Sequence, residues 1–307
     1  MKRILSLTIS ALAASFSLFA QGTDALPFTR IDRSPVLSGT AGAAITSSEN
    51  LAWTAFRNAS VIPFASSKMD VAAGFQLWAP QTAKSTNLQA GAAYRFTDRM
   101  GLSLGVAYQR GLSYEPVDDN GAASGSYTPS DLVAALGFGI GFGEHFSLGV
   151  NARLARQALS PKDSFTGFSG DVMLLYSPLE ALRLTAGVST LGNSITSATR
   201  KAFPQPAHAL VGAGYELGFG TSKLDAHLSG EYYFSGNFGV AAGLQYSWND
   251  MVFVRAGYRF ASEYCVIPSH LALGIGAKFA GVHIDLSYIT ASKALGNTLN
   301  IGLGYSF

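Results

Sequence analysis

The sequence predicts an all-β protein: a transmembrane antiparallel β-barrel of about fourteen strands with an N-terminal luminal segment. Of the 307 residues, 48% are hydrophobic and only 13% are charged, and the mean hydropathy is +0.22, which is too apolar for an ordinary soluble protein. Beyond the N-terminus no run of about 18 apolar residues occurs, which excludes membrane-spanning helices by length. Strand-length segments of alternating polarity recur to the chain end. Within the hydrocarbon layer, strands can hydrogen bond all of their backbone N–H and C=O groups only when the sheet closes into a barrel.

The N-terminus predicts an export signal. A positively charged start at residues 1–3 is followed by an apolar, hydroxyl-bearing stretch that ends at Ala20, before a polar segment. Leu18 departs from the small-x-small rule for a cut after Ala20, so an uncleaved N-terminal anchor helix is the alternative. We therefore expect three parts: a signal peptide at residues 1–20, a luminal plug or hatch at residues 21–63, and an outer-membrane β-barrel at residues 64–307.

The strand pattern is clearest in the last segment of the chain. Leu303, Tyr305 and Phe307 fall on one face, and the small residues Gly304 and Ser306 fall on the other. Most segments have about ten residues, as a tilted strand across the hydrocarbon requires. The expected strands are residues 68–78, 86–96, 99–108, 127–142, 145–156, 164–176, 181–189, 207–219, 223–234, 238–248, 251–260, 269–279, 282–289 and 298–307.

The connections between these segments alternate between tight and long. Outer-membrane barrels have short periplasmic turns and long external loops, so residues 109–126 and 190–206 are expected to form the largest external loops, with both chain ends periplasmic. Residues 235–237 form a short connection where a long one is due. That exception leaves the strand count open by one hairpin.

Composition and motifs argue against other classes of protein. The net charge is only +2 and no block of like charge occurs, so no nucleic-acid surface is expected. Cys265 is the single cysteine and cannot form an internal disulfide or a multi-cysteine metal site. The glycine-rich residues 137–143 could suggest a nucleotide-binding loop, but their period of two continues toward a strand and not a helix.

Charged residues on the inner faces of the predicted strands are candidates for lining the lumen. Basic side chains facing lipid at mid-depth would cost roughly 2–4 kcal/mol each, so these groups are expected to point inward. Two interpretations are open: a salt-bridged network that stiffens a polar interior, or a substrate path. The candidates are Asp225, His227, Glu231, Arg255, Arg259, Lys278, His283 and Asp285.

No catalytic chemistry is expected. A barrel hydrolase would need a nucleophile, a base and an orienting partner in one place, and none of the five histidines lies in a recognisable motif. His283 and Asp285 share one face but lack a third ligand visible in the sequence. We therefore predict a non-enzyme with no cofactor and no metal site.

Two stretches resemble a known family. Residues 257–260 (Gly-Tyr-Arg-Phe), 283–288 and 295–300 resemble the C-terminal part of the PorV/PorQ family of FadL-like barrels. Small residues 38–44 ahead of residues 52–58 resemble that family's segment before an Asn-Pro-Ala element, although Asn58 here is followed by Ala-Ser. The resemblance implies fourteen strands, an N-terminal luminal segment and, for PorV itself, a role in type IX secretion.

Three functions follow from these observations. The first is a PorV/PorQ-type protein that handles secretion components or secreted cargo through its loops. The alternative is a FadL-like channel for small hydrophobic molecules; an apolar pocket between the luminal segment and the wall would favour it, and a lumen packed solid with charged pairs would count against it. An open diffusion porin is disfavoured, because a luminal insert of about 40 residues blocks such a bore.

The same sequence features predict where the protein is located and which partners it has. We expect export to the outer membrane, contact with outer-membrane lipid, and insertion by the barrel-assembly machinery through a C-terminal signal containing Tyr305 and Phe307. No nucleic-acid partner is expected.

Overall fold

The computed structural model describes residues 24–79, 84–116, 125–161, 163–196, 201–292 and 295–307. The predicted signal peptide at residues 1–20 lies outside these residues. Within the described part of the chain, no helix combines the length and hydropathy needed to span a bilayer.

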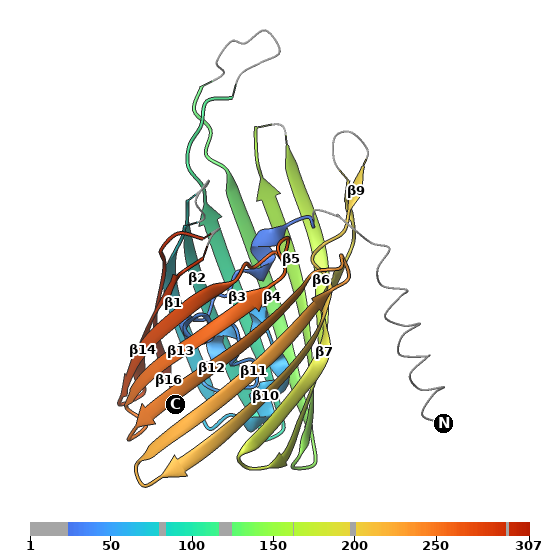
Figure 1. Cartoon of the computed structure of the whole chain (residues 1–307). Helices are drawn as coiled ribbons and strands as arrows, with labels where there is room; N and C mark the ends of the chain where they lie inside the picture. Colours follow the sequence, from blue (N-terminus) through green and yellow to red (C-terminus); the bar gives the residue numbers. More distant parts are fainter. Residues whose placement is uncertain (1–23, 80–83, 117–124, 162, 197–200, 293–294) are drawn as a thin grey trace, which may run out of the picture.

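Fourteen antiparallel strands form one closed barrel (Figure 1). The first and last strands pair with each other and close the barrel, from Asp70 opposite Ser306 to Leu77 opposite Leu299. The wall therefore has no edge strand whose backbone groups would face lipid without hydrogen-bond partners. The strands are β1 (Met69–Trp78), β2 (Ser85–Thr97), β3 (Met100–Arg110), β4 (Ser130–Phe142), β5 (Phe146–Ala158), β6 (Ser164–Leu179), β7 (Leu182–Gly192), β10 (His208–Phe219), β11 (Ser222–Tyr233), β12 (Phe238–Trp248), β13 (Val252–Ala261), β14 (His270–Phe279), β15 (Val282–Thr290) and β16 (Thr298–Ser306).

The predicted strand number is confirmed, and each predicted segment corresponds to one barrel strand. Strand β4 begins at residue 130 instead of 127, because Tyr127 forms an isolated bridge with Tyr114 across the long loop. The prediction missed a hairpin inside the loop after β7, where β8 (Ile195–Thr196) pairs with β9 (Ala202–Phe203). Strands of two residues are too short to show a period in the sequence.

The two ends of the barrel differ as predicted. Long connections, including the β8–β9 hairpin, lie at the top of Figure 1, and tight turns join the strands at the bottom. We call these the loop end and the tight-turn end. The short connection between β11 and β12 is a real feature of the loop end and not a missed hairpin. The rule for outer-membrane barrels predicts that the loop end faces outward and the tight-turn end faces the periplasm.

Side chains alternate between the lumen and the outer face along each strand. In β13 the outward Val254 and Phe260 are 52% and 54% exposed, while the inward Arg255 and Arg259 are each 2% exposed. Aromatic rings on the outer face also pair across strands, with Phe146 and Tyr176 stacked at 4.4 Å between ring centroids. The barrel therefore presents a mainly apolar surface on its outside and keeps most of the charged groups of its strands inside, with Arg110 and Arg156 as outward exceptions near the loop end.

The chain before β1 folds into the lumen as a plug (residues 24–64), seen in blue inside the barrel in Figure 1. It contains η1 (Pro27–Arg30), α2 (Pro35–Gly39), η2 (Leu51–Phe56) and η3 (Ala59–Phe64). Ser34 caps α2 by accepting a hydrogen bond from the Leu37 N–H, and Pro35 supplies the preset φ of a first helical residue. Asn58 caps η3 through the Ser60 N–H, so the missing proline does not prevent an ordered turn.

Strand β5 shows how closely the plug packs on the wall. Asn151 Nδ2 donates to the backbone oxygens of Thr54 at 2.9 Å and Ala55 at 2.7 Å. Two residues earlier on the same inner face, a Cβ at Gly149 would lie 2.8 Å from Ser60 Cα. Only glycine lets the plug backbone come this close to the strand. The small residues on the inner face of the wall therefore mark where the plug backbone packs against the sheet.

Candidate functional site

A buried carboxylate fastens the plug to the wall near the loop end. Glu231, two residues from the loop-side end of β11, accepts hydrogen bonds from Arg30 at 2.8 Å, Arg57 at 3.0 Å and Arg259 at 2.6 Å. The Tyr233 hydroxyl donates a fourth at 3.0 Å. Arg30 and Arg57 belong to the plug and Arg259 to β13. We call these five residues the Glu231 cluster; it joins the plug to two strands through a single anion.

A second group of charges holds the plug on the wall nearer the tight-turn end. Arg255 Nη1 donates to Asp285 Oδ1 at 2.7 Å, and plug residue Asn50 donates to the other carboxylate oxygen at 2.8 Å. His283 Nε2 lies 3.0 Å from Asp70 Oδ1. These five residues, the Asp285 cluster, connect the plug to β13, β15 and β1, so that both halves of the plug are anchored.

The plug contains three arginines and three acidic residues, and Arg30 and Arg33 are almost fully buried. Burial lowers the pKa of Arg30, but the Tyr233 hydroxyl and the Glu231 carboxylate outweigh that effect and hold the pKa above its usual value. Burial lowers the pKa of Arg33 to about 10, and its Nη2 donates to the backbone oxygen of Phe28 at 2.9 Å. Both guanidinium groups therefore stay charged at neutral pH and depend on wall carboxylates and backbone oxygens.

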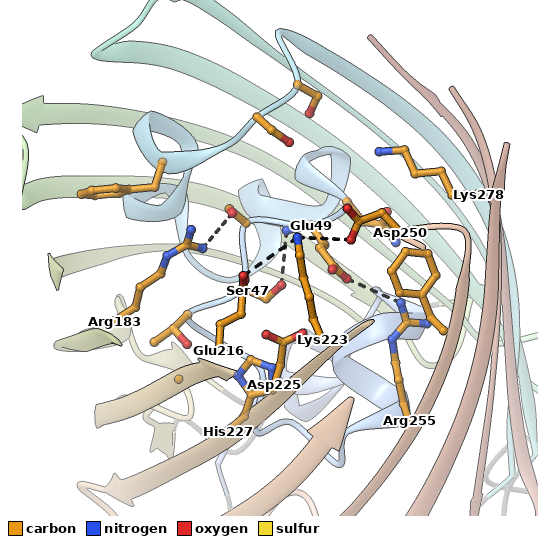
Figure 2. Close-up of a pocket in the computed structure, with 18 of the residues that line it drawn as sticks. Ser47, Glu49, Arg183, Glu216, Lys223, Asp225, His227, Asp250, Arg255 and Lys278 are labelled. Carbon is orange, nitrogen blue, oxygen red and sulfur yellow. Dashed lines mark hydrogen bonds and ion pairs between the residues drawn. The ribbon is translucent and has the colours of Figure 1, made fainter. Parts of the chain in front are cut away.

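A polar cavity of about 340 Å³ occupies the tight-turn end, and we call it the vestibule. Figure 2 shows Ser47 and Glu49 of the plug facing charged side chains of the wall. Lys223 at its centre lies 3.2 Å from Asp250 and 3.9 Å from Glu216. Both acidic and basic side chains line this space. It therefore suits water and polar groups and does not suit an apolar molecule.

An apolar cavity of about 240 Å³ lies at the loop end, and we call it the loop-end cavity. Ile195 and Phe203, which face each other across the β8–β9 hairpin, form one side of it. The backbone N–H of Ala25 donates to Pro204 O at 2.7 Å, which ties the beginning of the plug to the hairpin. The complete lining is Asp24, Ala25, Leu26, Pro27, Gln157, Phe165, Ile195 and Phe203.

The structure distributes the predicted lumen-lining residues over three places. Glu231 and Arg259 belong to the Glu231 cluster, and Arg255, His283 and Asp285 belong to the Asp285 cluster. The vestibule is lined by Asp225, His227 and Lys278, together with Arg255, His283 and Asp285. The predicted C-terminal signal residues Tyr305 and Phe307 lie on the outer face, 45% and 59% exposed.

Several inward polar residues were not singled out from the sequence. Arg153 on β5 pairs with Asp171 on β6 inside the barrel, and both occupy inward positions that the period of two could have identified. Arg30 and Arg57 could not be identified in that way, because the plug has no strand periodicity. The loop-end cavity was also missed, since its walls come from three distant parts of the chain.

Solved structures with the same fold include proteins that are named as a transporter and as a channel. The chain is similar to the toluene transporter TodX of Pseudomonas putida, with a TM-score of 0.64 and 16% identity over 89% of this chain and 97% of that one. It is also similar to the CymD monoaromatic hydrocarbon channel (TM-score 0.64, 13% identity, 95% of this chain and 99% of that one). A FadL homologue from Pseudomonas aeruginosa aligns with a TM-score of 0.55 and 11% identity over 89% and 96% of the two chains.

At these identities the likeness establishes the fold. No family model matches the sequence, and no curated protein matches it either. The resemblance to FadL-like barrels is thus confirmed at the level of fold, while the narrower PorV/PorQ assignment has no support from these neighbours. The chain has the architecture of a FadL-like outer-membrane barrel.

Proposed function

We propose that this protein is an outer-membrane channel for small hydrophobic molecules. The observation that carries the proposal is the loop-end cavity, which is apolar and lies between the plug and the barrel wall, at the end expected to face outward. The charged pairs of the lumen do not fill the molecule from end to end. Two clusters anchor the plug, and other pairs lie between β5 and β6 and in the vestibule. None of the ion pairs among the described residues lies in the loop-end cavity.

The volume of the loop-end cavity fits a small solute. Cavities for drug-sized ligands have about 300–1,000 Å³, and an apolar cavity of about 150 Å³ lined by aliphatic and aromatic side chains is known to hold benzene. A space of about 240 Å³ therefore suits one aromatic ring with short substituents. Two of the structural neighbours are named as a toluene transporter and a monoaromatic hydrocarbon channel, which supports the same substrate class for this chain.

The secretion role implied by the PorV/PorQ resemblance is a weaker candidate. It requires loops that bind protein cargo, and no contact or cavity in the described residues favours that over solute transport. Unchanged surface display of signal-bearing cargo after deletion of the gene would remove it. Co-purification of a secretion component with the tagged barrel would support it.

Making the loop-end cavity more polar should weaken the binding of toluene. Ile195 is 8% exposed, so Ile195→Gln places an amide where few partners exist, at a cost of about 1–3 kcal/mol. We expect toluene affinity to fall by about tenfold, measured by calorimetry on protein in lipid nanodiscs. Leu112→Gln is the matched control, because Leu112 is 63% exposed in another external loop. Equal affinities for both variants and the wild type would refute the assignment of this cavity.

Toluene binding should also depend on pH through Asp24. Burial raises the pKa of this carboxyl to about 6, and the hydrogen bond from Ser235 lowers it in part. Because the carboxyl lines the loop-end cavity, its neutral form suits an apolar ligand, and binding should weaken as the pH rises through about 6 and the carboxyl ionises. Calorimetry near pH 5 and near pH 7.5 should show tighter binding at the lower pH. The isosteric variant Asp24→Asn should remove the difference.

A further inference from the structure

The outer face of the barrel changes from apolar to polar near the loop end of five neighbouring strands, β2 to β6. On β3, Arg110 lies beyond the outward Tyr108 in the direction of the loops, and on β5, Arg156 lies beyond the outward Leu154. On the other three strands a hydroxyl residue lies beyond an apolar one in the same direction: Thr86 beyond Leu88, Ser130 beyond Leu132, and Thr166 beyond Phe168. We call Thr86, Arg110, Ser130, Arg156 and Thr166 the outer polar band.

Arg110 and Arg156 carry the only charges on the outward positions of the fourteen strands, as far as the structure describes them. The other Asp, Glu, Lys and Arg residues of these strands occupy inward positions of the alternation. Neither guanidinium forms a hydrogen bond or an ion pair with another described residue, including the exposed Glu115 and Asp163 of the adjoining loops. A basic side chain on the lipid face is costly at mid-depth and almost without cost near the interface. Both charges therefore lie at the tolerated end of the wall and are available to an anion.

The two arginines lie close enough to bind the same anion. Strands β3 and β5 flank β4, where Arg110 is opposite Ser130 and Arg156 is opposite Leu132. Two strand spacings amount to about 10 Å between the backbones, and both long side chains can extend over Ser130 between them. A guanidinium group presents paired N–H donors that match the oxygens of a phosphate. The arrangement therefore suits one phosphate group held by two arginines and a hydroxyl.

The spacing along β5 places Arg156 at the boundary of the hydrocarbon layer. Phe146 stacks on Tyr176 at the tight-turn end of the outer face, as the aromatic girdles of outer-membrane barrels do at the membrane interface. Phe146 and Arg156 are ten positions apart on the strand. For a strand tilted by about 40°, ten residues span about 25 Å along the barrel axis, which is the height of the apolar band of such barrels. When Phe146 lies at one interface, Arg156 therefore lies at the headgroups of the other.

The outer polar band covers one side of the barrel. On strands β12 to β15 the outward residues near the loop end are apolar or aromatic: Phe238, Phe260, Leu271 and Tyr288. None of these strands has a charged residue at a described outward position. An anionic headgroup is therefore attracted to β3, β4 and β5 and not to the whole circumference.

We propose that Arg110 and Arg156 bind the phosphate group of a lipid in the membrane leaflet at the loop end, which is the outer leaflet in the predicted orientation. The lipid's acyl chains lie against the apolar surface directly below the band, formed by Tyr108, Leu132 and Leu154, which are 44%, 39% and 40% exposed. A free phosphate ion would contact the arginines and leave this apolar surface uncovered. Only an amphiphile with an anionic head complements both parts, so the partner is a phosphorylated membrane lipid.

The first test removes the two charges and measures lipid binding. Diphosphoryl lipid A is titrated into the detergent-solubilised protein at fixed ionic strength, and the bound fraction is measured by native mass spectrometry. Arg110→Gln and Arg156→Gln should each weaken binding by about tenfold, as expected for the loss of a charge-assisted hydrogen bond, and the double variant should weaken it further. Arg99→Gln is the matched control, because Arg99 is an exposed arginine in the tight turn between β2 and β3. Wild-type affinity in the double variant overturns the proposal, and so does an equal loss in Arg99→Gln, which would show a general attraction of charge.

The second test separates a phosphorylated lipid from its two components. Lipid A from which both phosphates have been removed should bind the wild type at least tenfold more weakly than the diphosphoryl form. Inorganic phosphate in tenfold excess over diphosphoryl lipid A should not displace it, because the free ion makes no apolar contacts. Equal binding of the dephosphorylated lipid, or displacement by inorganic phosphate, would overturn the assignment of the partner. Neither experiment involves toluene, so the result is independent of the proposed channel function.

Discussion

Replacing Glu231 by glutamine should release the plug from the wall. The carboxylate is fully buried and is shared by Arg30, Arg57 and Arg259. Removing one partner of a buried ion pair typically costs about 3–5 kcal/mol, because the opposite charge is left uncompensated. Here three guanidinium groups lose the same anion, so Glu231→Gln is expected to reach the upper part of that range. The barrel wall should survive, since its backbone pairing does not depend on this residue.

The effect of Glu231→Gln can be measured as loss of plug order. Trypsin should cleave at Arg57 in the variant and not in the wild type, and the urea midpoint of refolded protein should fall. Glu216→Gln is the control, because its side chain is 50% exposed and 3.9 Å from Lys223, a pair worth less than about 1 kcal/mol. Adding Arg259→Met to Glu231→Gln should restore part of the stability by removing one unpaired charge. A protease-resistant plug in Glu231→Gln would contradict the anchoring role.

The wall of the barrel could be predicted from sequence because its determinants are local. Alternation within one strand decides which side chains meet lipid, and tight turns decide which strands are neighbours. Val254 and Arg255 illustrate this, since adjacent residues of opposite polarity lie on opposite faces. Fourteen strands and their faces followed from that rule. The β8–β9 hairpin did not, because four residues carry no detectable period.

The interior depends on contacts between distant segments, and the sequence does not display them. Glu231 was identified as an inward carboxylate, but its partners Arg30 and Arg57 are 201 and 174 residues away in the chain. The loop-end cavity requires Leu26, Phe165 and Phe203 to meet, which no local pattern indicates. Predicted lumen-lining residues therefore fell into two roles, anchoring the plug and lining the vestibule, that only the structure separates.

A single methyl group at Gly149 should displace the plug. A Cβ there would lie 2.8 Å from Ser60 Cα, and the obstacle is the plug backbone, which cannot rotate away as a side chain would. Overpacking of this kind costs about 1–3 kcal/mol. The added methyl group strains the contact between β5 and η3. We therefore expect Gly149→Ala to displace η3 from the wall while the strands stay paired.

Displacement of the plug would convert a blocked barrel into a leaking one. Barrels of eight strands are filled by side chains, and those of sixteen to eighteen strands leave an aqueous channel, so a fourteen-strand bore depends on its plug to exclude water. Gly149→Ala should therefore show steady ion conductance in planar bilayers where the wild type shows little. Gly218→Ala is the matched control, because nothing lies within 4 Å of a Cβ at that position and alanine is the better strand residue. Equal conductance in the two variants would mean that the contact at Gly149 does not seat the plug, and that the seal depends on the Glu231 and Asp285 clusters alone.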